Sequence, residues 1–339
     1  MAKHLFIDTN VYLRVFRKTS DTLNEVELLL ELVEAGEVVL YTTDQVIEEY
    51  FRNVEREIEE AFQEIRAIPD RAELPRLAQD FDHASEILEA FNKIQTAKKA
   101  LLAEAAEAAQ GGVLKADALI TGIFDAAVEI DRTDEIIDAS RLRRDLGNPP
   151  GKKDSLGDQI NWECLLAEVP DATEFAIISR DGDFTVKIGA RKVKQFLKDE
   201  WSAEKDSEIA LFHDIKGYLS HEFPDFKDAK SVKKSSAIKK LENSRSFMTT
   251  HRQIANLEEV YDQIKSSDSI RIFEALLSNN QIKWIATDED VESFYTKLFK
   301  RYYHETPSEL DERLYGVAPY LDPNASTDED EDDEDDMPF

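Results

Sequence analysis

Short apolar runs alternate along the chain with longer segments whose apolar residues recur every three or four positions. Residues 3–8 (KHLFID) and 38–42 (VVLYT) form two such runs near the start, and 175–179 (FAIIS) and 207–212 (SEIALF) form two more later. Runs of this length bounded by turn residues are typical of buried strands. Because these strands alternate with helical segments, we expect an α/β fold in which a parallel sheet is flanked by helices.

Helical spacing dominates the rest of the sequence. The predicted helical segments are 21–35, 44–65, about 76–110, about 114–145, 155–169, 192–201 and, as several helices, 213–320. We therefore expect an α/β domain over 1–212 with a helical insertion at about 60–145, followed by a helical C-terminal region over 213–322. The last segment, 323–339, is too acidic and too poor in apolar residues to fold by itself.

The composition says more about the cellular compartment of the protein than about its chemistry. Of the 339 residues, 42% are hydrophobic, which supports a sizeable core, and Cys164 is the single cysteine. One cysteine excludes an internal disulfide framework and a cysteine metal cluster, and it suits a reducing compartment. No apolar run approaches the length of a membrane span, and the N-terminus lacks the pattern of a secretion signal. We therefore expect a cytoplasmic protein.

The formal net charge is −30, from 72 acidic and 42 basic residues. Over the whole chain, this charge argues against a general polyanion binder. It does not exclude a nucleic-acid enzyme, because divalent cations invert the local field at an acidic site. Nine consecutive acids, residues 328–336, account for part of the excess. Any contact with nucleic acid must therefore come from local basic clusters.

Carboxylates follow the carboxyl ends of the predicted strands. Asp8 ends the first run, and the other acids lie in the turns and first helical turns of the α/β pattern: Glu48, Glu49, Asp158, Asp181 and Asp183. The carboxyl ends of parallel strands face one edge of a sheet, so we expect these acids to converge there. Left unpaired, they would repel each other and raise some of their pKa values. A hard divalent cation such as Mg²⁺ or Mn²⁺ removes that repulsion.

Each acid also has a purely structural explanation. Asp8 is a suitable helix cap, and Ser155 with Asp158 approaches a capping box. Glu48 and its neighbour suit the positive end of a helix, and residues 181–183 form a common turn sequence. Any one of these acids could stand at a strand end by chance. It is much less expected that all four do so by chance.

Together, these segments resemble the PIN-domain nucleases. The matching motifs are FIDTN (6–10), QVIEEY (45–50), GDQINW (157–162) and ISRDGDF (178–184). The resemblance covers roughly 1–60 and 140–212, and the loop before the third motif is similar to that of the larger PIN-like branch rather than the short toxins. It implies a metal-dependent phosphodiesterase that cuts RNA and, less often, DNA.

The resemblance also implies roles for individual residues. The catalytic and metal-binding residues would be Asp8, Glu49, Asp158, Asp181 and, as a fifth acid, Asp183. Glu49 is preferred to Glu48 because it precedes the aromatic Tyr50, where the family motif has a bulky residue. Asn10 and Ser179 would orient the ligands or bind metal-bound water.

Two basic clusters are candidates for binding the phosphodiester backbone. Their members are Arg141, Arg143, Arg144, Lys152 and Lys153 in the first, and Lys187, Arg191, Lys192, Lys194 and Lys198 in the second. A solvated basic face that offsets the surrounding acids is an equally good interpretation.

Other functions fit the residues less well. Haloacid-dehalogenase-like phosphatases need an Asp at position 10, where this chain has Asn10, and the phosphate-loop and dinucleotide motifs are missing. The six histidines lack metal-ligand spacing, so a zinc site is not expected. Asp117 in KADALI passes for the third acid, but no predicted strand follows it closely. The competing hypothesis is a non-catalytic interaction protein that retains the PIN-like fold as a scaffold.

The sequence ends in an acidic run followed by Met337, Pro338 and Phe339. Such a run is commonly a solubilising tail. This one also resembles the C-terminal tip of bacterial single-stranded-DNA-binding protein, which implies docking of Pro338 and Phe339 on DNA-processing proteins. A second possibility is that the tail covers the basic clusters of its own chain and restrains the nuclease.

Overall fold

The computed structural model describes residues 2–17, 23–78, 81–151, 155–186 and 192–323. The chain divides into two compact units, Met1–Ala229 and Lys230–Phe339, and each is described by itself. The first unit contains the sheet, and the described part of the second is helical. No helix in the described ranges is long and apolar enough to cross a membrane.

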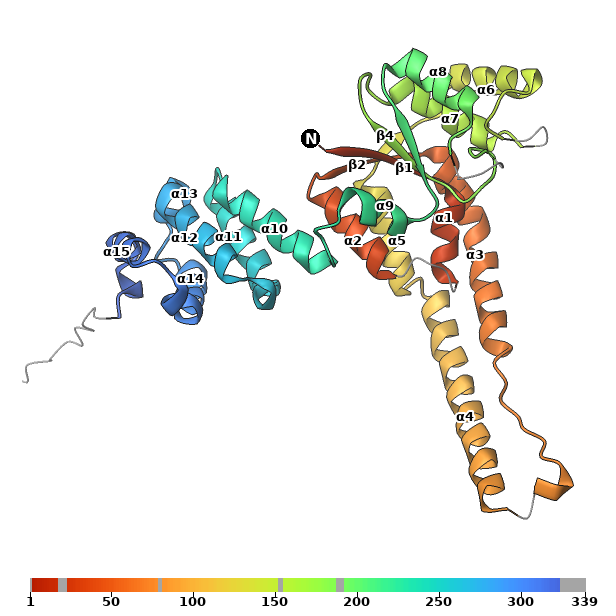
Figure 1. The fold of residues 1–339 in the computed structure, drawn as a ribbon, viewed down its shortest axis with the longest axis horizontal. Coiled ribbons are helices and arrows are strands. Elements are labelled where there is room, and N and C mark those ends of the chain that lie inside the picture. The colour runs from red at the N-terminus through yellow and green to blue at the C-terminus, as the bar shows by residue number, and fades with distance from the viewer. Residues whose placement is uncertain (1, 18–22, 79–80, 152–154, 187–191, 324–339) are drawn as a thin grey trace, which may run out of the picture. The chain divides into compact units, whose positions relative to one another are not determined.

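A five-stranded parallel sheet forms the centre of the first unit (Figure 1). Its strands are β1 (Lys3–Ile7), β2 (Val38–Thr43), β3 (Val128–Ile130), β4 (Phe175–Ile178) and β5 (Ile209–Phe212). In space they follow the order β3-β2-β1-β4-β5. The chain therefore adds β2 and β3 on one side of β1 and then returns to add β4 and β5 on the other side. The order in which strands are added thus reverses between β1 and β4, while all strands remain parallel. The predicted α/β fold with a parallel sheet is confirmed.

Helices cover both faces of this sheet. The helices of the first unit are α1 (Thr9–Leu13), α2 (Leu23–Glu34), α3 (Asp44–Arg66), α4 (Asp82–Gln110), α5 (Lys115–Ala126), α6 (Asp134–Leu146), α7 (Gly157–Glu168), α8 (Gln195–Lys205) and α9 (Ile215–Glu222). Figure 1 shows α2, α5 and α9 on one side of the strands and α6, α7 and α8 on the other. Leu5, Phe6 and Ile7 of β1 are fully buried between these layers, as expected for a central parallel strand.

The sequence pattern missed β3. A continuous helical segment was predicted over about 114–145, but the chain forms α5, the short strand β3 and then α6. β3 is an edge strand whose first two residues, Val128 and Glu129, are exposed. A three-residue run with one buried side chain carries no detectable alternation, so the flanking helical pattern masks it.

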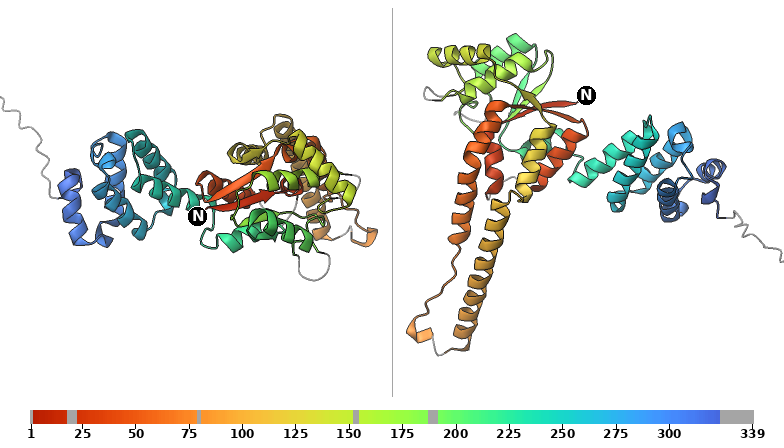
Figure 2. Two further views of the ribbon diagram at one scale, coloured as in Figure 1. Left: turned by 90° about the horizontal axis from the view of Figure 1, so that it is seen from above. Right: turned by 180° about the vertical axis from the view of Figure 1, so that it is seen from behind.

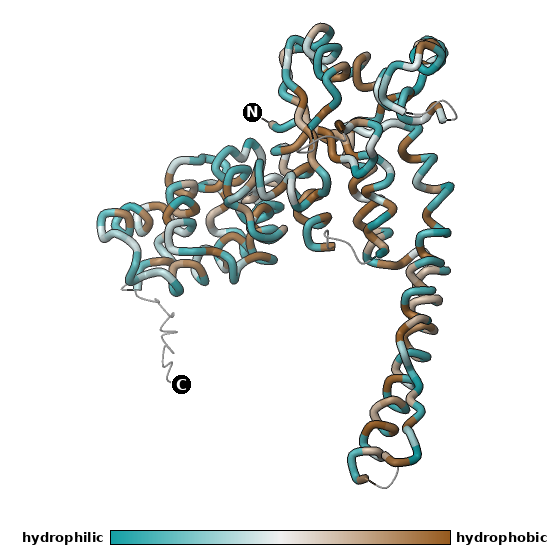
Figure 3. Tube along the Cα trace, turned by 45° about the vertical axis from the view of Figure 1, so that its right-hand side comes forward, coloured by the Kyte–Doolittle hydropathy of each residue, from teal (hydrophilic) through white to brown (hydrophobic). Residues whose placement is uncertain are grey.

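Helices α3 and α4 form the inserted arm, and they lie side by side in Figure 1 and in the right view of Figure 2. Lys98 of α4 holds them together, because its Nζ donates to the carbonyls of Arg66 at 2.7 Å and Ile68 at 2.8 Å. Hydrophobic and hydrophilic segments alternate along the arm (Figure 3), and several large apolar side chains, including Phe81 and Leu88, are exposed. The arm is thus held by few contacts and has little core of its own.

The second unit has its own hydrophobic core. The helices that supply it are α10 (Ala229–Glu242), α11 (Phe247–Glu259), α12 (Ser266–Ser278), α13 (Asn280–Lys283), α14 (Glu289–Tyr302) and α15 (Ser308–Val317). Phe273, Phe294, Tyr295 and Leu298 are fully buried at its centre. The prediction of a helical pattern over 213–320 is confirmed. However, α9 packs against α2 and β5, so the compact first unit extends past residue 212.

Candidate active site

Asp8 lies directly after β1, at the point where the strand order reverses. Its backbone N–H donates to the carbonyl of Ile178 at 2.9 Å, which joins the carboxyl ends of β1 and β4. In open α/β sheets the crevice at such a reversal is the usual ligand site, because the two connections leave the edge in opposite directions. Asp8 is only 6% exposed, so its carboxylate sits at the floor of this crevice.

Two polar side chains fix the Asp8 carboxylate. Ser179 Oγ donates to Asp8 Oδ2 at 2.6 Å, and Asn10 Nδ2 donates to the same oxygen at 2.5 Å. The backbone N–H groups of Asp181 and Arg180 donate in turn to Ser179 Oγ and Asn10 Oδ1, both at 3.2 Å. Asp8 occupies the N-cap position of α1 but makes no side-chain capping bond. The structural explanation of Asp8 as a helix cap is therefore wrong.

Both candidate glutamates lie on helix α3, but only one of them faces the crevice. Thr43 caps its start by accepting from the N–H of Val46 at 3.1 Å, and Thr43 Oγ1 donates to Asn161 Oδ1 of α7 at 2.6 Å. These bonds fix α3 relative to the end of β2 and to α7. Glu49 then lines the crevice, whereas Glu48 is exposed and pairs with Arg132, which lowers the pKa of the Glu48 carboxyl.

Asp158 enters the crevice from the first turn of α7. The helix begins at Gly157, where an added Cβ would stand 3.0 Å from Gln45 Nε2 and 3.5 Å from Glu49 Oε2. Glycine therefore allows the start of α7 to approach α3 closely at this point. The N-cap is Leu156 and no side chain caps the helix, so the capping box expected between Ser155 and Asp158 is not formed.

The predicted acids meet in one cavity of about 330 Å³. Asp181 and Asp183 line it from the loop after β4, together with Asp8, Glu49 and Asp158. The purely structural explanation for residues 181–183, a turn, describes the backbone there but not the presence of both carboxylates at the cavity. The five predicted carboxylates, from four separate segments, thus share this cavity.

Burial and mutual repulsion shift the pKa values in the cavity. Burial, together with repulsion from Glu49 and Asp181, raises the pKa of Asp8 to about 6, and the hydrogen bond from Ser179 opposes this rise. Burial also raises the pKa of Asp158 to about 8, with repulsion from Asp8, Asp183, Asp181 and Glu49. Without a cation, Asp8 and Asp158 therefore carry less than two full negative charges between them near neutral pH.

The chemistry of these side chains fits a hard divalent cation. All five donors are carboxylates, and oxygen ligands of this kind suit Mg²⁺ or Mn²⁺. In the part of the chain that the structure describes, no three acidic, histidine or cysteine side chains already stand close enough to form a metal-binding cluster.

The sequence comparison agrees with this geometry. A family model described as PIN domain matches residues 5–184, just over half of the chain. The chain belongs to the PIN-domain family. No curated protein and no solved structure gives a significant match. PIN domains are a family of nucleases that act on nucleic acids and typically use divalent metals, and the matched range contains the five predicted acids of the cavity.

Sequence reasoning missed several residues that line the cavity of this PIN domain. Arg14 and Arg17 lie one and two turns after Asn10, and Asn53, Arg56 and Glu57 continue the stripe that begins at Glu49. Spacings of three and four residues place such side chains on one helical face, so this periodicity was the available signal. Arg17 pairs with Glu57 at 3.1 Å and also contacts Glu60.

Arg14 differs from the other arginines of the cavity. It is exposed, and its guanidinium has no hydrogen bond or ion pair with any residue that the structure describes. Arg56, in contrast, pairs with Glu57 at 3.4 Å and with Glu60 at 3.8 Å. Arg14 is therefore a cation that remains available to an anionic ligand at the rim of the carboxylate cavity.

The first predicted basic cluster does not form a phosphate-binding surface around Arg143. This side chain is only 6% exposed and bonds to Glu163 at 2.6 Å, Glu200 at 2.6 and 3.0 Å, and the carbonyl of Pro149 at 2.7 Å. A phosphodiester cannot reach it, so the assignment of Arg143 to nucleic-acid binding is wrong. Its role is to tie α6 to α7 and α8.

The remaining members of the two basic clusters have mixed environments. Arg141 is exposed and pairs with Asp138 at 2.9 Å, and Arg144 pairs with Asp145 at 3.1 Å. Lys194 lines an open depression beside Asp181 and Asp183. Four predicted members lie outside the described residues: Lys152, Lys153, Lys187 and Arg191. Asp117 caps α5 by accepting from the N–H of Leu114 at 3.1 Å, so it is not a third acid of the site.

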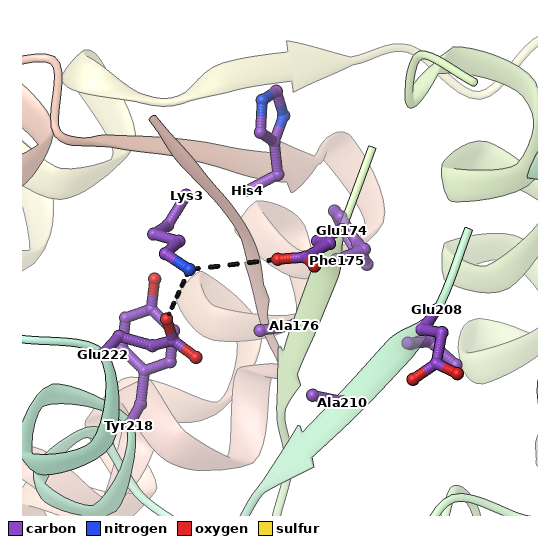
Figure 4. Close-up of a pocket in the computed structure, with 10 residues that line it drawn as sticks. Lys3, His4, Glu174, Phe175, Ala176, Glu208, Ala210, Tyr218 and Glu222 are labelled. Atoms are coloured by element: carbon purple, nitrogen blue, oxygen red, sulfur yellow. Dashed lines mark ion pairs between the residues drawn. The ribbon is translucent and has the colours of Figure 1, made fainter. Parts of the chain in front are cut away.

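A second cavity lies at the opposite edge of the sheet, at the amino ends of β1, β4 and β5 (Figure 4). It has a volume of about 150 Å³. Lys3 points into it between two acids and pairs with Glu222 at 2.8 Å and with Glu174 at 3.9 Å. Because its lysine is already paired with two acids and it lies away from the carboxyl ends of the strands, it is not the candidate active site of the PIN domain.

Proposed function

We propose that this PIN domain is a metal-dependent endonuclease that hydrolyses phosphodiester bonds. The observation that supports it most strongly is the convergence of the five predicted carboxylates, from four segments, on one cavity. At its rim stands Arg14, whose guanidinium has no ion pair with the described residues. Carboxylates are suited to hold a divalent cation, and the cation and the arginine together offset the charge of a phosphodiester. The preference for RNA over DNA rests on the family resemblance alone.

Each acid has a role in this proposal. Asp8 and Asp158 would hold the principal Mg²⁺ or Mn²⁺, Glu49 and Asp181 would complete its ligand set, and Asp183 would be a fifth acid. When bound, the cation would supply activation of water and neutralisation of charge at phosphorus.

The surrounding residues position these acids and the substrate. Ser179 and Asn10 keep the Asp8 carboxylate in one orientation through bonds to Oδ2. Each bond favours the ionised carboxylate, which is the form that binds a cation. Arg14, at the rim, would donate to the non-bridging oxygens of the scissile or a neighbouring phosphate.

Two further proposals concern the setting. The single cysteine, Cys164, is buried and free, and we propose a cytoplasmic location on composition alone. The acidic tail, including Pro338 and Phe339, lies outside the described residues. Its docking on proteins that bind the tip of single-stranded-DNA-binding protein therefore remains a separate prediction.

The test compares neighbouring glutamates. Purified protein is incubated with end-labelled single-stranded RNA and DNA in Mn²⁺, Mg²⁺ or EDTA. We expect Mn²⁺- or Mg²⁺-dependent cleavage that falls by about 100-fold or more in Asp8→Asn and Glu49→Gln. Glu48→Gln is the matched control, because Glu48 is exposed and paired with Arg132 outside the cavity, and it should cleave normally.

Two outcomes would overturn the proposal. Cleavage that persists at the normal rate in Asp8→Asn would place the activity elsewhere or in a contaminant. Absence of cleavage of every substrate by a folded wild-type protein with either metal would favour the scaffold hypothesis instead.

A further inference from the structure

An exposed aromatic pair stands on the surface of the second unit. Phe247 begins α11 and Trp284 directly follows α13, and their ring centroids are 6.3 Å apart in an edge-to-face arrangement. Trp284 is 69% exposed, Phe247 44% and the adjacent Met248 70%. Trp162 and Trp201, in comparison, are fully buried. A large aromatic surface in water is unfavourable for folding, so its exposure suggests a ligand.

Polar contacts join the two segments that carry the pair. Asn279 Nδ2 donates to the carbonyl of Ser244 at 2.9 Å and makes longer bonds to the carbonyls of Leu241 and Glu242, and Asn279 Oδ1 accepts from the N–H of Gln281 at 2.9 Å. The start of α13 is thereby tied to the segment that leads into α11. Because the two segments are already joined, binding of a ligand across both rings needs no ordering of the backbone, which reduces its entropic cost.

Three cations flank the aromatic pair. Arg245 precedes Phe247 by two residues, Arg252 lies one turn after Met248 on the same face of α11, and Lys283 precedes Trp284. None of the three cations forms an ion pair or a hydrogen bond with a residue that the structure describes.

Several other cations of the unit, in contrast, are paired with acids. Ion pairs join Lys233 to Glu259, Lys234 to Asp268, Arg271 to Glu242, Lys297 to Glu258 and Arg313 to Glu274. The acids that follow Trp284 in the chain, Asp288 and Asp290, contact His251. The cations beside the aromatic pair are therefore left to an external anion.

We propose that this surface binds single-stranded nucleic acid, with bases stacked on Trp284 and Phe247 and phosphates paired with Arg245, Arg252 and Lys283. Exposed rings interleaved with unpaired cations are the features that single strands use, since every base has a π-face and every linkage a negative charge. A duplex hides its base faces and would contact only the cations. The proposal takes its ligand class from the proposed nuclease function, but it concerns binding and not cleavage.

Trp284 provides its own reporter. Full-length protein in EDTA, where no metal-dependent cleavage occurs, is titrated with short oligo(dT) or oligo(U), and tryptophan emission and oligonucleotide anisotropy are followed. Stacking on Trp284 should quench its emission, while the two buried tryptophans stay unaffected. The dT and U arms distinguish DNA from RNA as the ligand.

Substitutions separate stacking from general apolar contact. Trp284→Leu keeps an apolar side chain without a π-face and should weaken binding about 5- to 100-fold, whereas Trp284→Phe should retain most of the affinity. Replacing Arg245 and Lys283 by Gln should reduce the salt dependence of binding. Phe81→Leu, at a 66% exposed aromatic of the arm, is the matched control and should change nothing.

The proposal fails if oligonucleotides leave Trp284 emission unchanged, or if Trp284→Leu binds them with the affinity of the wild type. Quenching by a peptide of residues 328–339 but by no oligonucleotide would also overturn it and would assign the surface to an acidic protein segment. The nuclease proposal is tested apart from this one. Loss of cleavage in Asp8→Asn with normal quenching concerns only the nuclease site, and cleavage without quenching concerns only the aromatic surface.

Discussion

Replacing Asp158 by Asn should stabilise the metal-free protein, and the gain should grow with pH. The pKa of this carboxyl rises from its ordinary 3.8 to about 8 through burial and repulsion from the neighbouring acids. Between these values the folded protein keeps a proton that the unfolded chain has released. Raising the pH through this window therefore lowers the free energy of unfolding by about 1.4 kcal/mol per pH unit.

The size of the effect follows from the same shift. At pH 7 the buried carboxyl costs the folded state about 4 kcal/mol, and at pH 5 about 1.5 kcal/mol. Because Asp158 is partly exposed, solvent screening reduces these costs, and we expect at least half of each. The amide that replaces the carboxyl carries no charge at either pH, so Asp158→Asn should gain about 2 to 4 kcal/mol at pH 7 and about 1 kcal/mol at pH 5.

Urea unfolding in EDTA measures this gain at both pH values. A Trp284→Phe background leaves Trp162 and Trp201, both buried in the first unit, as the fluorescent reporters, so the transition reports on the unit that contains the site. Glu48→Gln in the same background is the control. It should bring no gain in stability, since the carboxyl of Glu48 is exposed and paired with Arg132 in the wild-type protein. A variant Asp158→Asn that is no more stable than its parent at pH 7, or equally stabilised at both pH values, would refute the electrostatic argument.

Three more predictions address the metal, the buried arginine and the tail. Millimolar Mn²⁺ at about 100 times its dissociation constant should raise the melting temperature of the first unit by roughly 5–10 °C, and a double Asp8→Asn, Asp158→Asn variant should lose most of this rise in a thermal scan. Arg143→Ala should lower the free energy of unfolding by about 3–5 kcal/mol, because it removes a buried cation and leaves the partly buried carboxylates of Glu163 and Glu200 without it. The exposed Arg141→Ala should cost less than about 0.5 kcal/mol in urea titrations. A peptide of residues 328–339 should bind a receptor of the single-stranded-DNA-binding-protein tip more weakly as salt rises; binding that is equal without its last residue would exclude docking by the terminal Phe.

Local pattern determined the strands and the acids that follow them. β1, β2, β4 and β5 were predicted within a few residues, because buried parallel strands are continuous apolar runs that contrast with their surroundings. Parallel strands share one edge, and so the convergence of Asp8, Asp158 and the acids after β4 was also predicted from sequence. The short edge strand β3 was not, since pairing with β2 and not its own pattern makes it a strand.

Tertiary packing decided which way individual side chains point. Glu48 and Glu49 are neighbours on a helix and point about 100° apart, so only the rotation of α3, set by the buried Val46 and Tyr50 and by the Thr43 cap, brings Glu49 into the cavity. Arg143 was predicted from the sequence to be a surface cation. It is buried in the structure, because α7 and α8 each bring a glutamate to it.

The aromatic surface of the second unit shows the same limit. Phe247 and Trp284 lie far apart in the sequence, and each resembles an ordinary core residue of an amphipathic helix. Only the packing of α11 against α13 places the two rings together on the outside, with unpaired cations beside them. The sequence thus specifies which residue types are present on each element, and the rotation and packing of the elements decide which of them face a ligand.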